Sequence, residues 1–434
     1  MRVIETRDTK AMRRLLAPPS RDDRAFERRV RTIVDGVRTG GDRALVRYAR
    51  RFDGVAPPLE ISEAEMQAAA ARVDPSIRLA IARAANHIAR VAFRQLPRHF
   101  DLTVAPGVSI EQRAEPLASV GCYVPGGRFP LPSSLLMTAV PARVAGVRDI
   151  VVVCPRPDDV VMAAAVEAGA TRLFRVGGAH AIAALAFGTA TVPRVDKIVG
   201  PGNRYVATAK ALVAGTCAID FYAGPTEIVI VAGRGRASWI AADLVAQAEH
   251  DPEARAIFIT WSRSLARHTA AAAARMSASR PLVRRALASH GAVVVARDAD
   301  EAMSLANRIA PEHLVVENEA LAARPITAGA LFVGPYTAQA LGDYATGSNH
   351  VLPTAGAARF RGGLSAADFM RVMSVQRVTR EGLSRLATIA VPLARAEGLE
   401  AHAASIEIRL NVEMGSDPFS QKGTPKRGQT PFRH

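Results

Sequence analysis

The chain is poor in cysteine, lysine and aromatic residues, and each shortage narrows the possible functions. Cys122, Cys154 and Cys217 form an odd, scattered set, which argues against a disulfide framework. Aromatic residues make up 5% of the chain, too few for a platform that stacks on single-stranded nucleic acid. No apolar run is long enough to span a bilayer, and residues 1–31 lack the apolar segment of a signal peptide. These absences predict a cytoplasmic protein without a membrane partner.

The formal net charge of +16 raises the hypothesis of a basic nucleic-acid-binding protein. Only five of the 56 basic residues are lysines, and the arginines are dispersed among acidic residues rather than packed into a stripe. We therefore predict no nucleic-acid partner, and we expect the phosphates of a cofactor to be the only nucleotide groups bound. A steeply salt-dependent shift of DNA would support the alternative.

The hydrophobic pattern predicts an α/β protein. At 434 residues the chain is long enough for two or more domains. Strands alternate with helices from residue 119 to 213 and again from 227 to 346, which predicts parallel sheets of Rossmann-like type. Around this pattern we expect a short basic arm at residues 1–18, a mostly helical stretch at 368–393, and a disordered tail at 413–434 without apolar period.

Glycine-rich turns follow three of the predicted strands, at residues 125–128, 177–178 and 200–203. Backbone N–H groups at such turns commonly meet phosphates, so these turns are candidates for a nucleotide site. None of them spells the complete G-x-G-x-x-G motif, so their spacing alone is a weak dinucleotide signal.

Two titratable residues stand side by side in the segment Ala310–Leu314, with the sequence APEHL. Pro311 moves Ala310 out of the helical region, so Glu312 and His313 lie at a junction between a helix and a strand. A histidine there can take a proton near neutral pH, and a neighbouring carboxylate can activate a water molecule. An isolated Glu-His pair is more often structural, so the interpretation depends on the other polar clusters.

Candidate metal ligands are spread over three segments: Gln247, His250, Asp343 and His402. Gln247 and His250 are three residues apart and share a helix face. Taken singly, each residue is more often structural, and no compact zinc signature is present. As a cluster, these oxygen and nitrogen donors would suit zinc or manganese.

Longer motifs resemble those of the histidinol dehydrogenase family over about residues 20–410. They are IDFYAGPTE (219–227), QAEH (247–250), APEHL (310–314), GDYATGSNHVLPT (342–354) and EGLEAH (397–402). The resemblance implies a zinc-dependent, four-electron oxidation of L-histidinol to L-histidine through L-histidinal. Two NAD would be reduced, in the final steps of histidine synthesis.

The resemblance also implies a role for each matching residue. Glu312 and His313 match the water-activating acid and the general base. One zinc per subunit would be held by Gln247, His250, Asp343 and His402, the last of these from the partner subunit of a homodimer. NAD would contact Tyr123, His180 and Asn203. Substrate would contact Thr226, Gln247, His250, His313, Asp343, His350, Glu397 and His402.

The fold implied by the resemblance has two Rossmann-like parallel-sheet domains, the second inserted in the first. The first domain would comprise residues 19–118 and 227–365 and hold the zinc and the base, and residues 119–226 would bind NAD. Residues 366–412 would form a C-terminal helical segment for dimerisation, and residues 1–18 a small arm.

Two positions depart from the family pattern, and two alternatives stay open. His180 stands where the family usually has Gln, and Thr226 where it usually has Ser. A cysteine nucleophile is another route to oxidise an aldehyde, and Cys122 is the candidate, although no histidine neighbours it in sequence. A related zinc- and NAD-dependent dehydrogenase of another small polar alcohol would share the metal and base residues.

Overall fold

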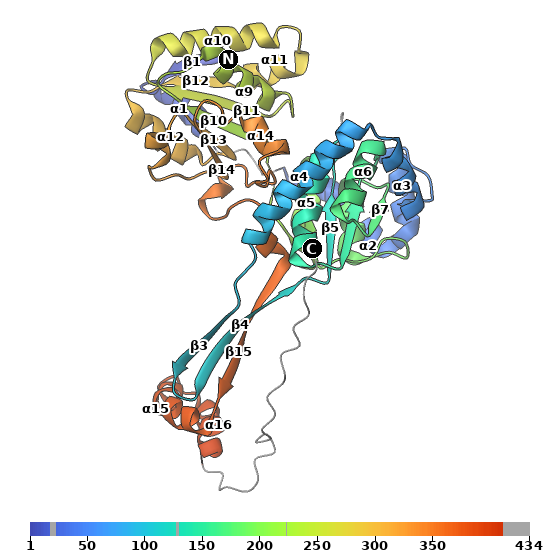
Figure 1. Ribbon diagram of the computed structural model, residues 1–434, viewed down its shortest axis with the longest axis vertical. Coiled ribbons are helices and arrows are strands. Elements are labelled where there is room, and N and C mark those ends of the chain that lie inside the picture. Colours follow the sequence, from blue (N-terminus) through green and yellow to red (C-terminus); the bar gives the residue numbers. More distant parts are fainter. Residues whose placement is uncertain (18–22, 127–129, 223, 411–434) are drawn as a thin grey trace. The chain divides into compact units, whose positions relative to one another are not determined.

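The computed structural model describes residues 1–17, 23–126, 130–222 and 224–410 (Figure 1). The chain divides into two compact units. The first comprises residues 1–97 and 115–371, and the second comprises residues 98–114 and those from 372 onward. The predicted tail at 413–434 lies outside the described residues. No helix in the described part of the chain is long and apolar enough to cross a membrane.

One six-stranded sheet of the first unit, here called the β10 sheet, is parallel throughout. Its strands in spatial order are β1 (Arg2–Glu5), β12 (Ala292–Val295), β11 (Arg255–Thr260), β10 (Glu227–Val231), β13 (His313–Val316) and β14 (Ala330–Val333). One face packs against α9 (Ala237–Ala248), α10 (Arg263–Ser277) and α11 (Pro281–Ser289). The other face packs against α1 (Thr9–Leu16), α12 (Ala299–Ile309) and α13 (Glu319–Ala322).

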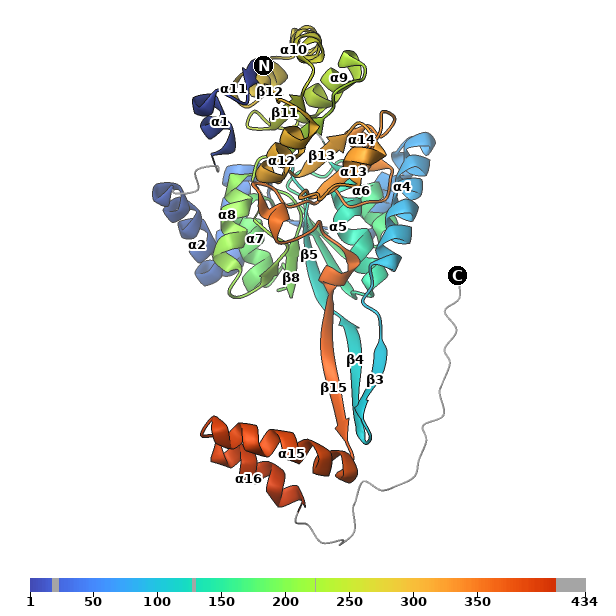
Figure 2. The ribbon, with the colours of Figure 1, turned by 90° about the vertical axis from the view of Figure 1, so that its left-hand side faces the viewer.

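The other six-stranded sheet, here called the β5 sheet, is parallel except for its edge strand β2. Its spatial order is β2 (Glu60–Ile61), β7 (Arg172–Phe174), β6 (Asp149–Val153), β5 (Ser119–Tyr123), β8 (Lys197–Val199) and β9 (Ala218–Ile219). Helices α3 (Glu63–Arg72), α4 (Pro75–Arg94), α5 (Pro132–Ala145) and α6 (Asp159–Ala168) cover one face. Helices α2 (Arg24–Tyr48), α7 (Gly178–Phe187) and α8 (Arg204–Val213) cover the other (Figure 2).

Both sheets use the same winding. The chain enters at a central strand (β10 or β5), adds two strands toward one edge, and then crosses to add strands on the opposite side. In such sheets ligands bind where the order reverses, beyond the carboxyl ends of the strands. In the β5 sheet this reversal lies between β5 and β8. The prediction of an α/β protein with parallel sheets is confirmed.

Three predicted domain assignments differ from this arrangement. Residues 98–114, expected in the first domain, belong to the second unit. Residues 1–18 are not a separate arm, because β1 pairs with β12 along Arg2–Glu5 and extends the β10 sheet. Residues 24–94 do not join the β10 sheet. Helices α2 to α4 pack against the β5 sheet, and β2 is its edge strand. The apolar faces of these helices match neighbouring helices that lie far away in the sequence, and local patterns cannot reveal such partners.

The second unit contains a three-stranded sheet and a helical hairpin. The sheet has the order β15 (Met370–Val378), β4 (Val108–Pro116), β3 (Phe100–Ala105), and the hairpin is α15 (Arg380–Ala396) and α16 (Glu400–Leu410). The expectation of a mostly helical stretch at 368–393 is therefore wrong for 370–378. Those residues form a strand, because β4 supplies a hydrogen-bonding edge and Arg377 pairs with Glu111 of β4 at 2.7 Å.

Four short elements complete the fold of the described residues. The π-helix η1 (Ala49–Asp53) follows α2, and α14 (Gln339–Tyr344) follows β14. Two 3₁₀ turns, η2 (Ala357–Arg359) and η3 (Ala366–Phe369), precede β15.

A buried ion pair fixes the turn between β8 and α8. The Lys210 and Asp220 side chains are 2% and 1% exposed and form an ion pair. The Lys210 ammonium donates to the Gly200 carbonyl at 3.0 Å, and the Asp220 carboxylate accepts the Gly200 N–H at 2.8 Å. Gly200 has φ +114°, and a Cβ there would meet the Tyr123 carbonyl oxygen, so the turn needs glycine.

We predict that Lys210→Met lowers the free energy of unfolding by about 3–5 kcal/mol, because it leaves the Asp220 charge buried without its partner. Urea unfolding measures the loss. Arg72→Met is the matched control, since Arg72 pairs with Asp159 on the surface, where both side chains are at least 40% exposed. A loss no larger than that of the control would contradict the account.

Candidate active site

The Glu312–His313 pair lies at the start of β13, beside the start of β10. Ala310 ends α12 with φ 51° and ψ 62°, a left-handed conformation that is unusual for alanine and turns the chain toward the sheet. His313 then pairs with Ile228 in the parallel register of β10 and β13. Glu312 and His313 therefore lie at the amino end of β13. Doubly wound sheets usually bind ligands at the opposite edge, beyond the carboxyl ends of the strands.

The backbone of Glu227 holds both members of the pair. Its N–H donates to Glu312 Oε2 at 2.8 Å, and its carbonyl accepts a hydrogen bond from His313 Nδ1 at 3.0 Å. Because Nδ1 must carry the proton for this bond, Nε2 is left as the unprotonated ring nitrogen. Burial lowers the pKa of His313, against the opposing effect of the Asp343 carboxylate. His313 is therefore a neutral base with its free nitrogen available.

Glu312 is held by hydrogen bonds and by burial. The Thr226 hydroxyl donates to Glu312 Oε2 at 2.5 Å, and Thr226 in turn accepts from Gln247 Nε2 at 2.5 Å. Burial raises the pKa of Glu312 to about 8, and the Asp343 charge acts in the same direction. The carboxyl is therefore protonated at neutral pH until positive charge nearby lowers its pKa.

Three predicted metal ligands belong to the same unit, and their chemistry fits a zinc ion. Gln247 is 1% exposed, and its Oε1 is a buried acceptor without a hydrogen-bond partner. Asp343 is 9% exposed and accepts from Gln339 Nε2 at 3.0 Å. His250 follows α9 and is exposed. Amide oxygen, carboxylate and imidazole are donor types that suit zinc, and the Gln247 oxygen is the one left without a partner.

No three histidine, cysteine, aspartate or glutamate side chains in the described ranges form a metal-binding group on their own. The predicted set includes an amide, Gln247. Its fourth member, His402, lies in α16 of the second unit. Glu397 lies in the same unit and follows the last residue of α15.

His350, which we predicted to contact substrate, also lies in the first unit. Its Nδ1 donates to the Asp343 carbonyl at 3.1 Å, and its Nε2 lies 3.5 Å from the Ser134 hydroxyl. Burial lowers the pKa of His350, so the ring is neutral. Hydrogen bonds thus join Gln247, Thr226, Glu312 and His313 in one group, through the Glu227 backbone, and Asp343 and His350 in another.

The predicted NAD residues lie at the carboxyl edge of the β5 sheet. Tyr123 ends β5, His180 lies in the first turn of α7, and Asn203 precedes α8. Tyr123 and His180 are 3% and 1% exposed, whereas Asn203 is exposed. Asn203 Oδ1 caps α8 by accepting the N–H groups of Tyr205 and Val206 at 3.0 and 3.2 Å, which leaves its amide nitrogen as a donor.

The glycine turns differ from the phosphate cradles that we expected. Gly177 N–H donates to Asp53 at 3.0 Å, Gly178 N–H to the Tyr123 hydroxyl at 3.2 Å, and Gly200 N–H to Asp220 at 2.8 Å. The protein already satisfies these groups, and two of the acceptors are carboxylates. A phosphate would therefore meet neither free donors nor favourable charge at these three N–H groups.

Sequence reasoning missed three residues that support the site: Glu227, Gln339 and Asp53. Glu227 acts through its backbone, which has no sequence signal. Gln339 lies four residues before Asp343 in α14, a spacing that places two side chains on one helix face and could have been noticed. Asp53 lies 124 residues before Gly177, so only the fold shows their contact.

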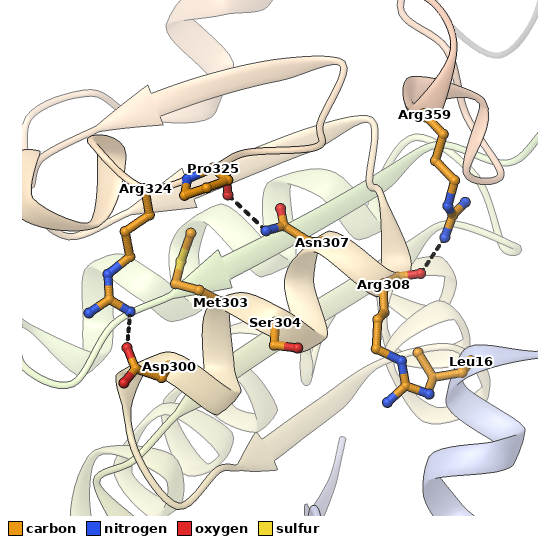
Figure 3. Close-up of a pocket in the computed structure, with 9 residues that line it drawn as sticks. All are labelled: Leu16, Asp300, Met303, Ser304, Asn307, Arg308, Arg324, Pro325 and Arg359. Carbon is orange, nitrogen blue, oxygen red and sulfur yellow. Dashed lines mark hydrogen bonds and ion pairs between the residues drawn. The ribbon is translucent and has the colours of Figure 1, made fainter.

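A pocket of about 930 Å³ lies away from these residues, between the end of α1, α12 and the segments around Arg324 and Arg359. None of the predicted site residues lines it. Figure 3 shows two of its three arginines occupied within the protein: Arg324 pairs with Asp300 at 2.7 Å, and Arg359 donates to the Arg308 carbonyl.

The alternative of a cysteine nucleophile finds no support. Cys122 is fully buried in β5, and burial raises the pKa of its thiol to about 12. A thiol that keeps its proton and has no access to solvent is a poor nucleophile.

The parallel sheets and the buried Glu312–His313 pair are those of an α/β protein with a candidate acid–base site. The sequence matches the family described as histidinol dehydrogenase over residues 16–410, and the chain belongs to that family. It is 47% identical over 400 residues to histidinol dehydrogenase of Brucella suis, covering 89% of this chain and 93% of that protein. The Geobacter sulfurreducens relative is 44% identical over 428 residues, covering 94% of this chain and 100% of that one.

The crystal structure of histidinol dehydrogenase from Elizabethkingia anophelis shares the fold, with a TM-score of 0.89 at 30% identity. The match covers 94% of this chain and 98% of that one. The chain is accordingly an oxidoreductase of histidine biosynthesis.

We predict a pH-dependent stability that originates at Glu312. The folded carboxyl keeps its proton up to about pH 8, whereas an unfolded glutamate loses it near 4.5. Between these values the folded state binds more protons, so this group makes the metal-free protein less stable as the pH rises. The melting temperature of Glu312→Gln should therefore rise relative to wild type from pH 5 to 8. A difference that stays constant across this range would contradict the raised pKa.

Proposed function

We propose that the site oxidises L-histidinol to L-histidine through L-histidinal, with two NAD as hydride acceptors. The observation that carries the proposal is the pairing of a neutral His313, its Nε2 free, with a protonatable Glu312 on the same backbone anchor. Two successive oxidations need both a base for an alcohol proton and a group that activates water, and this pair supplies them.

In the first oxidation, His313 Nε2 would take the proton of the substrate hydroxyl. NAD, when bound, would accept hydride from the carbinol carbon as the carbonyl of the aldehyde forms. The fixed Nδ1 bond to Glu227 stabilises the ring as it becomes an imidazolium.

In the second oxidation, Glu312 would accept a proton from water as the water oxygen bonds to the aldehyde carbon. A second NAD would then accept hydride from the hydrated carbon as one hydroxyl of the hydrate loses its proton to the base His313, and the resulting carboxylic acid would ionise to the carboxylate. The role requires a deprotonated Glu312, so positive charge near the carboxyl must counter the burial that raises its pKa.

Zinc would be held by Gln247, His250 and Asp343 together with His402. When bound, it would orient the imidazole and amino nitrogens of the substrate as a template and supply positive charge. The orphaned Gln247 Oε1 supports this assignment, because a buried acceptor without a partner is costly unless a ligand satisfies it. His350, Thr226 and Glu397 would complete the contacts to substrate.

NAD would bind at the β5 sheet, and substrate and zinc at the β10 sheet. The two sheets would be two Rossmann-like domains, with the β5 sheet inserted in the chain between β1 and β10. Tyr123 and Asn203 support this assignment, since Tyr123 ends β5 and Asn203 follows β8, the strands between which the strand order reverses.

The second unit would form the homodimer and deliver His402 and Glu397 to the partner's site. Its exposed apolar side chains support the proposal, because they form surface that a subunit interface would bury. Six of these side chains are more than half exposed: Leu102, Val104, Val372, Ile389, Leu393 and Ile408.

The two catalytic roles can be separated by substitution. His313→Ala should lower turnover of L-histidinol by roughly 10²–10⁴-fold, because it removes the base. Glu312→Gln should slow oxidation of supplied L-histidinal much more than the first hydride transfer, measured as single-turnover NADH formation. Equal losses in both half-reactions for Glu312→Gln would remove its assigned role.

Subunit mixing tests the shared site. Inactive His402→Ala mixed with inactive His313→Ala should regenerate activity, because one site of each mixed dimer contains both residues. Random exchange makes about half of the dimers mixed, so recovery should approach roughly a quarter of wild type.

The control for this mixture is His313→Ala with Asp343→Ala. Both of those changes lie in the first unit of one chain, so no whole site can form and no activity should return. If exchange is verified and the His402→Ala mixture also stays inactive, His402 serves its own chain.

A further inference from the structure

Asp53 is a buried carboxylate that no proposed step uses. It ends the π-helix η1, and Gly54 follows in a left-handed conformation with φ 70°. The Asp53 side chain is 9% exposed. Its Oδ2 accepts two hydrogen bonds, from the Gly177 N–H at 3.0 Å and from His180 Nε2 at 2.8 Å. One carboxylate oxygen thus links η1, which follows α2, to the turn between β7 and α7.

The His180 ring is committed to this contact. His180 is 1% exposed, and its ring lies 6.1 and 6.0 Å from the rings of Tyr48 and Phe52, which stack on each other at 5.8 Å. With Nε2 donating to Asp53 and the ring enclosed by aromatic side chains, the imidazole braces the turn from inside the protein.

The Gly177–Gly178 turn, held by Asp53, orients Tyr123. Gly178 has φ +57°, and its N–H donates to the Tyr123 hydroxyl oxygen at 3.2 Å. Since this bond occupies the oxygen as an acceptor, the phenolic proton is left to donate elsewhere. Burial raises the pKa of Tyr123 further above its usual value, so the proton is retained.

We propose that Asp53 is a positioning residue of the dinucleotide site: it acts through His180 and the Gly177–Gly178 turn to present the Tyr123 hydroxyl as a hydrogen-bond donor to NAD. The inference rests on the proposed binding of NAD at the β5 sheet. His180 then contributes to NAD binding indirectly, because it shares the Asp53 carboxylate oxygen with the turn. The Tyr123 proton would be donated to an uncharged or phosphate oxygen of NAD.

Asp53→Ala should weaken NAD binding because it leaves two buried donors, the Gly177 N–H and His180 Nε2–H, without their acceptor and releases the turn. We expect the Kd for NAD, measured by equilibrium titration of the zinc-loaded protein, to rise roughly tenfold. Zinc content and the KM for L-histidinol should stay close to wild type, since those sites lie on the β10 sheet.

Asp42→Ala is the matched control. Asp42 of α2 also holds a loop of the β5 sheet, accepting from the Thr191 hydroxyl at 2.7 Å and from its N–H at 3.3 Å. That loop leads into the amino end of β8, so the Kd for NAD should not change. His180→Gln keeps a side-chain N–H donor for Asp53 and should retain most of the affinity, as should Asp53→Asn if Asp53→Ala does not fold.

A double-mutant cycle with Tyr123→Phe decides whether Asp53 acts through Tyr123. Tyr123→Phe alone should also raise the Kd for NAD, and adding Asp53→Ala should then change it less than twofold. Independent, multiplying effects, or an Asp53→Ala Kd equal to wild type, would overturn the inference. If Tyr123→Phe and Asn203→Ala both leave NAD binding intact, the nucleotide site lies elsewhere, and the proposed location fails together with the inference.

Discussion

The parallel pairing of β10 with β13 is the constraint on which the candidate site depends. Through this pairing the backbone of Glu227 reaches both members of the candidate pair: its N–H binds Glu312 and its carbonyl binds His313. The choice of tautomer follows from that carbonyl and not from any side chain. The Glu227 carboxylate is itself anchored by Arg255 at 3.1 Å, and Arg255 also donates to the Leu15 carbonyl at 2.8 Å. The N-terminal segment thus supports the site from the far side.

In the β5 sheet, two buried carboxylates anchor glycine turns. Asp53 with His180 and Asp220 with Lys210 each place a carboxylate behind a glycine turn, where it accepts the first N–H group of the turn. Each pair costs desolvation, which a polar network recovers only if every member is satisfied. Because these N–H groups are already satisfied, the proposed NAD would be recognised by oriented side chains, Tyr123 and Asn203, rather than by a backbone phosphate cradle at these turns.

The sequence was informative where function depends on neighbouring residues. The strand–helix alternation predicted the parallel sheets, and Glu312 and His313 could be paired because they adjoin. Contacts between distant segments were not predictable. β1 has four residues, too few for a pattern, and its place beside β12 is set by the finished sheet. Residues 370–378 have no clear alternation, and β4 makes them a strand. The contacts of Asp53 and of the Glu227 backbone likewise exist only in the fold.

The central claim is that one neutral histidine and one activatable carboxyl carry out two oxidations in a single site. The most direct test is the amount of NADH formed per L-histidinol when the substrate is limiting and NAD is in excess. The account predicts two NADH for each L-histidinol, with L-histidine as the product and no free aldehyde. One NADH for each L-histidinol, with L-histidinal accumulating, would contradict it.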